Sequence, residues 1–260
     1  MEAHDVVDMM IKRGVEPNVV TYNALMDGHC LRSEMDEAVK VFDTMVCKGF
    51  APDVVSYSTL INGYWQDSKD RKGHDAIALF HEMVTRGQIP DFVSYCILLD
   101  YLCKNRRLDE AIALLKAIEG SNMDPDIQIY TIVIDGMCRA GELEAARDLF
   151  SNLSSKGLHP NVWTYTIMIN GLCQQGLLAE ASKLFGEMKR KGYSPNGCTY
   201  NLITRGFLRN NETLRGIQLL QEMLARGFSA DVSTSTVLVE MLSDDGLDQS
   251  VKQILSEFLQ

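Results

Sequence analysis

Cysteine and histidine are the side chains in this sequence best able to act as nucleophiles, bases or metal ligands. The chain has seven cysteines and five histidines, but no C-x-x-C pair, no H-E-x-x-H, no Walker-type glycine loop and no G-x-S-x-G turn. Four cysteines each lie eight residues after a tyrosine, namely Cys30, Cys103, Cys138 and Cys173. A cysteine that recurs singly in this way indicates a small buried hydrophobic residue in a reducing compartment. The sequence therefore predicts no catalytic residue, no metal site and no cofactor.

The tyrosines mark a repeat that runs through the whole chain. Six of them follow one another at steps of 35, 38, 35, 35 and 35 residues, and all six prolines keep the same spacing. The tyrosines are Tyr22, Tyr57, Tyr95, Tyr130, Tyr165 and Tyr200, and the prolines are Pro17, Pro52, Pro90, Pro125, Pro160 and Pro195. A period of about 20–50 residues is typical of stacked-repeat proteins, in which each repeat contacts only its neighbours.

Each repeat contains two helical patterns joined by a polar turn. In residues 162–196 the first runs from Val162 to about Gln174 and the second from Leu178 to Lys191, with apolar residues at three- and four-residue spacing. Gly192 is expected to end the second helix. The chain then divides into 1–18, the second helix of a truncated leading repeat; complete repeats at 19–53, 54–91 (with a three-residue insertion), 92–126, 127–161, 162–196 and 197–231; and 232–260, a divergent terminal repeat.

Charge and hydropathy limit the classes of partner. The net charge is −10 and the pI is near 5.0, so the chain as a whole is not a nonspecific binder of polyanions. No apolar run approaches the roughly 20 residues of a membrane span. The N-terminal residues lack the basic, acid-poor composition of a targeting peptide, so we expect none within this chain. The sequence predicts neither a membrane partner nor a small-molecule substrate.

The consensus of the repeats is P-[DN]-V-V-[ST]-Y-[NTS]-x-L-I-[DN]-G-x-C, followed by an A-x-x-L-F-x-x-M helix and K-G. This pattern resembles the pentatricopeptide repeat family, specifically its pure 35-residue P-type class, and is similar to the restorer-of-fertility-like branch from plants. The resemblance covers essentially all 260 residues. It implies an all-α fold, a right-handed superhelical α-solenoid of tandem helix-turn-helix repeats.

The same resemblance implies a non-enzymatic protein that binds single-stranded RNA, with one base per repeat. The expected process is organellar RNA processing, stability or translation control, in the mitochondrion or alternatively the chloroplast. Other RNA-processing proteins are the further partners that the family suggests.

The resemblance also assigns site residues, because in the family the fifth and last residues of each repeat contact the base and the second wedges between bases. The fifth and last pairs here are Asn23 with Asp53, Ser58 with Asp91, Cys96 with Asp126, Thr131 with Asn161, Thr166 with Asn196, and Asn201 with Asp231. The base-wedging residues are Val20, Val55, Val93, Gln128, Trp163 and Cys198. The basic residues expected near the phosphates are Lys104, Arg139 and Arg209, each nine residues after a repeat tyrosine.

The chemistry of the last residue suggests which base each repeat selects. The Watson–Crick edge has an N–H donor at its centre in uracil and guanine, but an acceptor nitrogen in adenine and cytosine. An ionised Asp only accepts, whereas an Asn amide can donate. In the family, Asn at the fifth position goes with pyrimidines, and Ser or Thr with purines. The repeats then predict the target U-G-N-A-A-U, with the N-terminal repeat at the 5′ end and the base facing Cys96 and Asp126 undetermined.

Alternatives stay open at this stage. Asp and Asn are favoured N-caps, so capping of the next helix alone could explain the last position. Asn, Ser or Thr fills the fifth position in five of six complete repeats, although these are indifferent helix formers. We therefore expect this position to line a polar surface, with a merely solvated face as the alternative. For the whole protein, the alternative function is a protein–protein interaction scaffold of the helical-repeat type.

Overall fold

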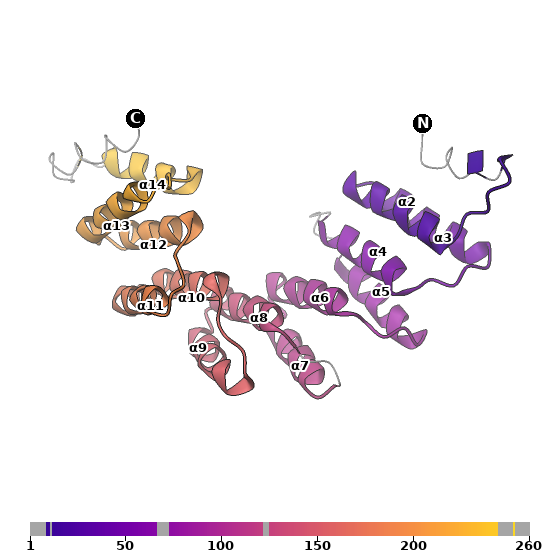
Figure 1. Ribbon diagram of the computed structural model, residues 1–260, viewed down its shortest axis with the longest axis horizontal. Helices are drawn as coiled ribbons and strands as arrows, with labels where there is room; N and C mark the ends of the chain where they lie inside the picture. Colours follow the sequence, from indigo (N-terminus) through magenta and orange to yellow (C-terminus); the bar gives the residue numbers. More distant parts are fainter. Residues whose placement is uncertain (1–8, 11, 67–72, 122–124, 244–251, 253–260) are drawn as a thin grey trace. The chain divides into compact units, whose positions relative to one another are not determined.

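The computed structural model describes residues 9–10, 12–66, 73–121, 125–243 and 252, and all regular secondary structure among them is helical (Figure 1). The insertion expected in residues 54–91 falls mainly on 67–72, outside the described residues. The chain divides into two compact units, Met1–Pro125 and Asp126–Gln260. None of the helices in the described ranges is long and apolar enough to cross a membrane.

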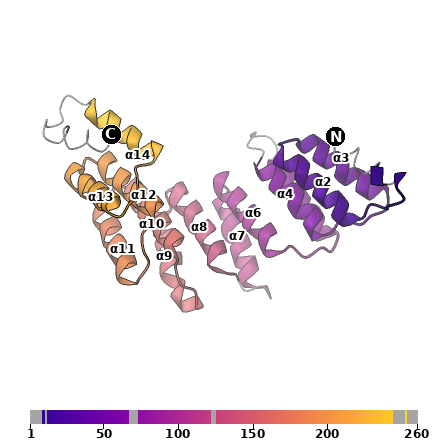
Figure 2. The same cartoon turned by 45° about the horizontal axis from the view of Figure 1, so that its top comes forward.

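The described part of the first unit contains three helical hairpins. They are α2 (Val19–Leu31) with α3 (Met35–Cys47), α4 (Val54–Gln66) with α5 (Gly73–Thr85), and α6 (Phe92–Lys104) with α7 (Leu108–Glu119). The first helices pack in series, α2 against α4 and α4 against α6, and each preceding second helix also contacts the next first helix (Figure 2).

The second unit repeats this arrangement. Its helices are α8 (Ile127–Ala140), α9 (Leu143–Asn152) with a short 3-10 helix (Ser154–Lys156), α10 (Val162–Gln174), α11 (Leu178–Arg190), α12 (Gly197–Arg209), α13 (Thr213–Ala225) and α14 (Val232–Leu242). The first helices α8, α10, α12 and α14 pack in series, and α9, α11 and α13 each pair with the first helix of their own hairpin.

Glycine ends the second helices where a left-handed backbone is needed. Gly49 and Gly192, which follow α3 and α11, both have a φ of 85°, a conformation strained for any residue with a Cβ atom. The Gly192 N–H donates to Lys189 O at 3.1 Å, which satisfies one carbonyl at the end of the helix. The turn then leads to the buried Pro195 and the start of the next first helix.

The repeated tyrosines form the contact between successive hairpins. Tyr57, Tyr165 and Tyr200 have no exposed surface. Each ring packs edge-on against a phenylalanine from the second helix of the preceding repeat, at centroid distances of 5.3–5.5 Å, in the pairs Phe42–Tyr57, Phe150–Tyr165 and Phe185–Tyr200. The hydroxyl at the far end of the ring reaches a glutamate of its own repeat, as between Tyr200 and Glu222 Oε1 at 2.8 Å. One inter-repeat contact therefore explains the periodicity of both tyrosine and phenylalanine.

The G-x-C sequence joins neighbouring first helices. A Cβ atom on Gly171 would lie 2.7 Å from Cys138 Sγ, and one on Gly206 would lie 2.6 Å from Cys173 Sγ. The glycine of one repeat therefore leaves the space that the cysteine of the preceding repeat fills. Burial raises the pKa of the Cys138 and Cys173 thiols to about 12. None of the seven cysteines, all within the described residues, is in a disulfide, and the four recurring ones are buried as packing residues.

Candidate nucleic-acid interface

The last residue of each complete repeat caps the first helix of the next repeat. Asn161 Oδ1 accepts a hydrogen bond from Thr164 N at 2.9 Å, and Asn196 Oδ1 accepts one from Thr199 N at 3.0 Å. The four aspartates make the same kind of bond at 2.7–2.9 Å, namely Asp53, Asp91, Asp126 and Asp231. The capping role that the sequence suggests for this position is therefore confirmed.

Capping leaves the second polar atom of each side chain available. Within the part of the chain that the structure describes, Nδ2 of Asn161 and Asn196 and Oδ2 of Asp91 and Asp231 have no hydrogen-bond partner. A backbone N–H needs an acceptor, so the cap directs the amide oxygen of Asn toward the helix and its NH2 group away from it. The available atom is thus a donor in Asn and an acceptor in Asp, and the cap restricts its position.

The fifth residues lie in a different environment from the one expected. Asn23, Cys96, Thr131, Thr166 and Asn201 are each 8% exposed or less. The third residue of the next repeat covers the fifth: the hydroxyl oxygens lie 2.7 Å apart in Ser58–Ser94, 2.9 Å apart in Thr131–Thr164 and 2.7 Å apart in Thr166–Thr199. The expectation that the fifth position lines a polar surface is therefore wrong for these five residues, whereas Ser58 is half-buried. Contact of the fifth residue with a base stays a prediction.

The structure brings the two members of five predicted pairs to the same junction between repeats. Thr166 contacts Thr199 Oγ1, which in turn lies 3.0 Å from Asn196 Oδ1, so one hydroxyl links the fifth and last residues. The pairs Ser58–Asp91 and Thr131–Asn161 are linked in the same way. The sixth pair is divided, because Cys96 belongs to the first unit and Asp126 to the second.

Two repeats carry the same Asn–Asp pair but connect it differently. Asn23 Nδ2 donates to Asp53 Oδ1 at 3.1 Å. Asn201 instead donates through Nδ2 to two backbone carbonyls, and its Oδ1 accepts from Asp231 N at 2.9 Å. Burial alone would raise the pKa of Asp53 and Asp231, but the hydrogen bonds that both carboxylates accept outweigh it and hold each pKa below its usual value. Both groups are therefore ionised at neutral pH and act only as acceptors.

The predicted wedge residues are exposed side chains in the first turn of the first helices. Val20 is 71% exposed and Trp163 is 54% exposed. The remaining members are also exposed, namely Val55, Val93, Gln128 and Cys198. Stacking against a base requires an accessible face, and these positions supply one, while their wedging role stays a prediction.

Two of the three basic residues expected near phosphates are already paired. Lys104 Nζ lies 2.9 Å from Asp100 Oδ2, and Arg139 Nη2 lies 2.5 Å from Asp135 Oδ2. Each partner is four residues earlier on the same helix, so an aspartate offsets much of the charge.

Arg209 differs, because it forms no ion pair with any described residue. It lines a recess of about 430 Å³ between α10 and α12, together with Arg205, Asn170 and Gln174. Arg205 is a residue that sequence reasoning missed. The sequence did contain a signal for it: the equivalent residue in the other five complete repeats is Asn or Asp, so an arginine at this position is an exception.

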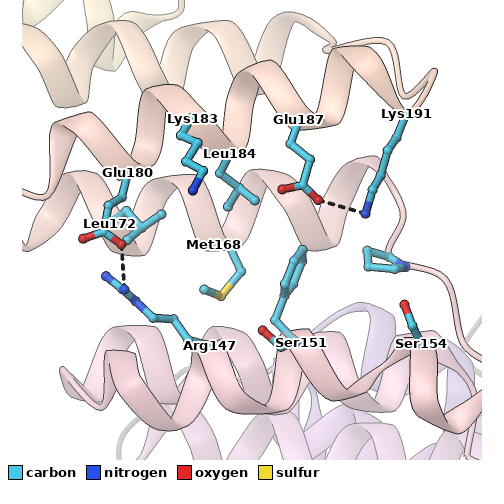
Figure 3. A pocket seen from close by; sticks show the side chains of 12 residues that line it. Arg147, Ser151, Ser154, Met168, Leu172, Glu180, Lys183, Leu184, Glu187 and Lys191 are labelled. Atoms are coloured by element: carbon cyan, nitrogen blue, oxygen red, sulfur yellow. Dashed lines mark ion pairs between the residues drawn. The ribbon is translucent and has the colours of Figure 1, made fainter.

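A second recess, of about 500 Å³, lies between α9 and α11 (Figure 3). Arg147 Nη1 lies 2.6 Å from Glu180 Oε2 across it, and Lys191 Nζ lies 2.8 Å from Glu187 Oε1 on its α11 side. These four charges cancel in pairs, which leaves Lys183 as the one further charged residue of the lining, and no predicted base-contacting residue lines this recess. We assign it no role in ligand binding.

Two models of known repeat families match most of the chain. The model of the PPR repeat family matches residues 1–31, 17–66, 68–104, 90–139, 125–174 and 168–209, and the PPR repeat model matches residues 198–228. No curated protein matches the chain significantly.

Solved structures of similar fold come from maize and Arabidopsis thaliana. The pentatricopeptide repeat protein PPR10 from maize is 23% identical, with a TM-score of 0.65 over 97% of this chain and 42% of its own. PPR10 in complex with an 18-nt psaJ RNA element gives a TM-score of 0.66 over the same shares at 23% identity. The PPR domain of A. thaliana protein-only RNase P 1 in complex with tRNA is 13% identical, with a TM-score of 0.58 over 70% of this chain and 94% of that one.

At these identities the likeness shows the fold, and the chain spans about two fifths of the length of the PPR10 structures. The expected all-α helical-repeat solenoid is confirmed. Because the family model matches nearly all of residues 1–209, the chain belongs to the PPR repeat family.

Proposed function

We propose that the chain binds single-stranded RNA sequence-specifically, with one nucleotide facing each complete repeat. The observation that carries the proposal is the cap geometry: the last residue is held by its bond to the next helix and offers one remaining polar atom. Each repeat thus presents one hydrogen-bond donor or acceptor, which can pair with the central atom on the Watson–Crick edge of one unpaired base.

The proposed target core is U-G-N-A-A-U. The side-chain oxygens of Asp53, Asp91 and Asp231 accept the N–H of uracil or guanine, and the amide groups of Asn161 and Asn196 donate to adenine. Because Thr131 and Thr166 are buried and hydrogen-bonded, we assign them mainly to holding the cap of the next repeat, through the threonine hydroxyl that links the two positions. Discrimination between purines and pyrimidines would then depend on the space that the fifth side chain leaves for the base.

Stacking supplies the part of the affinity that does not depend on sequence. Exposed Val20 and Trp163 offer apolar faces beside the caps, and stacking of a base on an aromatic ring contributes about 1–3 kcal/mol. Phosphate attraction is expected to be modest, because the net charge is −10 and both Lys104 and Arg139 are paired with aspartates. We therefore expect a shallow salt dependence for a nucleic-acid-binding protein.

Similar proteins support RNA as the ligand class, since PPR10 and a protein-only RNase P domain have been solved in complex with RNA. On the sequence resemblance, we further place the chain in the P-type class and restorer-of-fertility-like branch. We assign it to the transcripts of a plant organelle, the mitochondrion first. It acts there as a passive clamp that affects processing, stability or translation, with other RNA-processing proteins as partners.

The test is binding of a fluorescent oligonucleotide that contains U-G-U-A-A-U, compared with a shuffled oligonucleotide of the same composition, across a range of salt concentrations. We expect the shuffled RNA to bind at least tenfold more weakly, because several base contacts of about 1–3 kcal/mol each are lost. Equal affinity for both, or none for either, would favour the protein–protein scaffold instead.

A further inference from the structure

The residue four positions after the fifth residue differs in one repeat. This position lies one helical turn further along the same face of the first helix. It is Asp27, Asn62, Asp100, Asp135 and Asn170 in the first five complete repeats, and Arg205 in residues 197–231. A positive side chain at this position is therefore specific to one repeat of the chain.

Arg205 reaches the cap at the start of α14. Its Nη1 lies 3.3 Å from Asp231 Oδ1 and donates to Thr234 Oγ1 at 3.3 Å. The Arg205 side chain is 16% exposed, whereas that of Asp231 is 49% exposed. The contact is therefore a partly buried charge pair with one exposed member, and that member is the residue proposed to meet the base.

Comparison with residues 19–53 shows what Arg205 replaces. Both repeats carry Asn at the fifth position and Asp at the last. In 19–53 the Asn23 amide donates to Asp53 Oδ1, but the Asn201 amide donates to backbone carbonyls instead. Arg205 supplies the missing donor to the Asp231 carboxylate.

Arg205 also brings donors that Asn23 lacks. A guanidinium has five N–H groups in a fixed planar fork. The Nε and Nη2 groups of Arg205 have no hydrogen-bond partner among the described residues. They belong to a side chain that lines the 430 Å³ recess, next to Asn170 and Arg209.

We propose that Arg205 is a third base-contacting residue of the 197–231 repeat and makes this repeat more selective for uracil over guanine than the 19–53 repeat. The inference rests on the proposed RNA binding. Uracil has its central N–H between two carbonyl oxygens, so Asp231 accepts the N–H while a guanidinium N–H donates to a neighbouring carbonyl. Guanine has a carbonyl on one side only and an amino donor on the other. Adenine and cytosine have an acceptor at the centre, which a carboxylate repels.

The experiment uses four oligonucleotides, U-G-U-A-A-X, that differ only at the nucleotide facing this repeat. A second series, X-G-U-A-A-U, varies the first nucleotide, which faces the 19–53 repeat. Their Kd values are measured for the native chain, Arg205→Asn (the residue at position 170), Arg205→Lys and the control Arg209→Gln (the residue at position 174). We expect the native chain to prefer U over G by about tenfold at this nucleotide. Arg205→Asn should reduce that ratio to the one measured at the first nucleotide, and Arg205→Lys should reduce it too, because an ammonium lacks the planar fork.

Arg209→Gln should weaken all four oligonucleotides by the same factor and lower the salt slope by about one unit, as expected for loss of a phosphate contact. The ratio of Kd values also controls for folding, because a partly unfolded variant loses affinity for all four RNAs equally. The last variant introduces the arginine into the 19–53 repeat. Asp27→Arg should raise the preference for U over G at the first nucleotide, and damage to the fold cannot produce such an increase.

Uniform weakening by Arg205→Asn would overturn the inference, because Arg205 would then be a phosphate contact. A native chain that selects bases at the other nucleotides but binds U and G equally at the last would also overturn it, and would leave the proposed function intact. A native chain that selects no base anywhere would overturn both.

Discussion

Exchange of the two capping asparagines for aspartate replaces the side-chain NH2 group proposed to contact the base with a carboxylate oxygen, and it leaves the helix cap in place. In Asn161→Asp with Asn196→Asp, Oδ1 still accepts from Thr164 N and Thr199 N, at the present distances of 2.9 and 3.0 Å. Asn and Asp are nearly equal as N-caps, and a carboxylate at a helix N-terminus is favourable. The free energy of unfolding should therefore change by less than about 0.5 kcal/mol per site.

RNA preference should change far more than stability. In each of the two repeats an N–H donor that faces the ring nitrogen of adenine becomes a carboxylate oxygen, so one hydrogen bond is lost and two acceptors face each other. Each loss is worth about 1–3 kcal/mol, or about 2–6 kcal/mol for two independent repeats. At 1.4 kcal/mol per factor of ten, the native preference for A-A over G-G should fall by roughly 30-fold or more, and guanine should become the better base at both nucleotides.

The assay compares Kd values of U-G-U-A-A-U and U-G-U-G-G-U for the native chain, both single variants and the double variant. Each single variant should alter one nucleotide only, the fourth for Asn161→Asp and the fifth for Asn196→Asp. Asn161→Ser is the matched control, because a serine caps the helix with its one oxygen and offers no second atom. It should lose the preference for adenine at the fourth nucleotide without gaining one for guanine. A double variant that still prefers A-A would refute the base-edge argument, even with tight RNA binding.

Three further substitutions and one chemical modification test packing and the exposed face. Gly171→Ala should destabilise the fold by about 1–3 kcal/mol in urea unfolding, since its Cβ would meet a cysteine sulfur at 2.7 Å. Gly186→Ala should stabilise the fold by about 0.5–1 kcal/mol, since its Cβ would meet no described atom within 4 Å apart from its own stretch of helix. Alkylation of the native chain followed by mass spectrometry should label exposed Cys198 and Cys47; target RNA should slow labelling of Cys198 only, and equal protection of both would contradict the predicted interface. Trp163→Ala should weaken RNA binding by about 1–3 kcal/mol irrespective of sequence, and an unchanged Kd in anisotropy titrations would exclude stacking there.

The helices could be predicted from the sequence because the signals that set them lie within one repeat. The pattern in residues 162–196 predicted helices over Val162–Gln174 and Leu178–Lys191, and the structure has Val162–Gln174 and Leu178–Arg190. A positive-φ glycine and a proline separate most repeats from the next, namely Gly49 and Pro52, Gly87 and Pro90, Gly157 and Pro160, and Gly192 and Pro195, which fixes the register of the helices there. The four recurring cysteines were likewise identifiable as core residues from their period alone.

The environment of the fifth residue could not be predicted, because what covers it comes from another repeat. Thr166 is buried by Thr199, 33 residues later, and a helix pattern gives no measure of how closely two such hydroxyls approach. The pairing of Lys104 with Asp100 was available from the sequence as an i, i+4 pair. The contact of Arg205 with Asp231 was not, since it depends on the placement of α12 against α14.

Capping by itself does not account for the choice of residue at the last position. Serine caps helices about as well as Asp and Asn, yet all six complete repeats end in Asp or Asn. Nor does this fold need side-chain caps in general, because five second helices start without one, at Glu34, Arg107, Glu142, Leu177 and Glu212. Asp and Asn differ from serine in having two polar atoms, of which the cap uses one and orients the other. A requirement for that second atom explains the restriction to these two residues, and a requirement for capping alone does not.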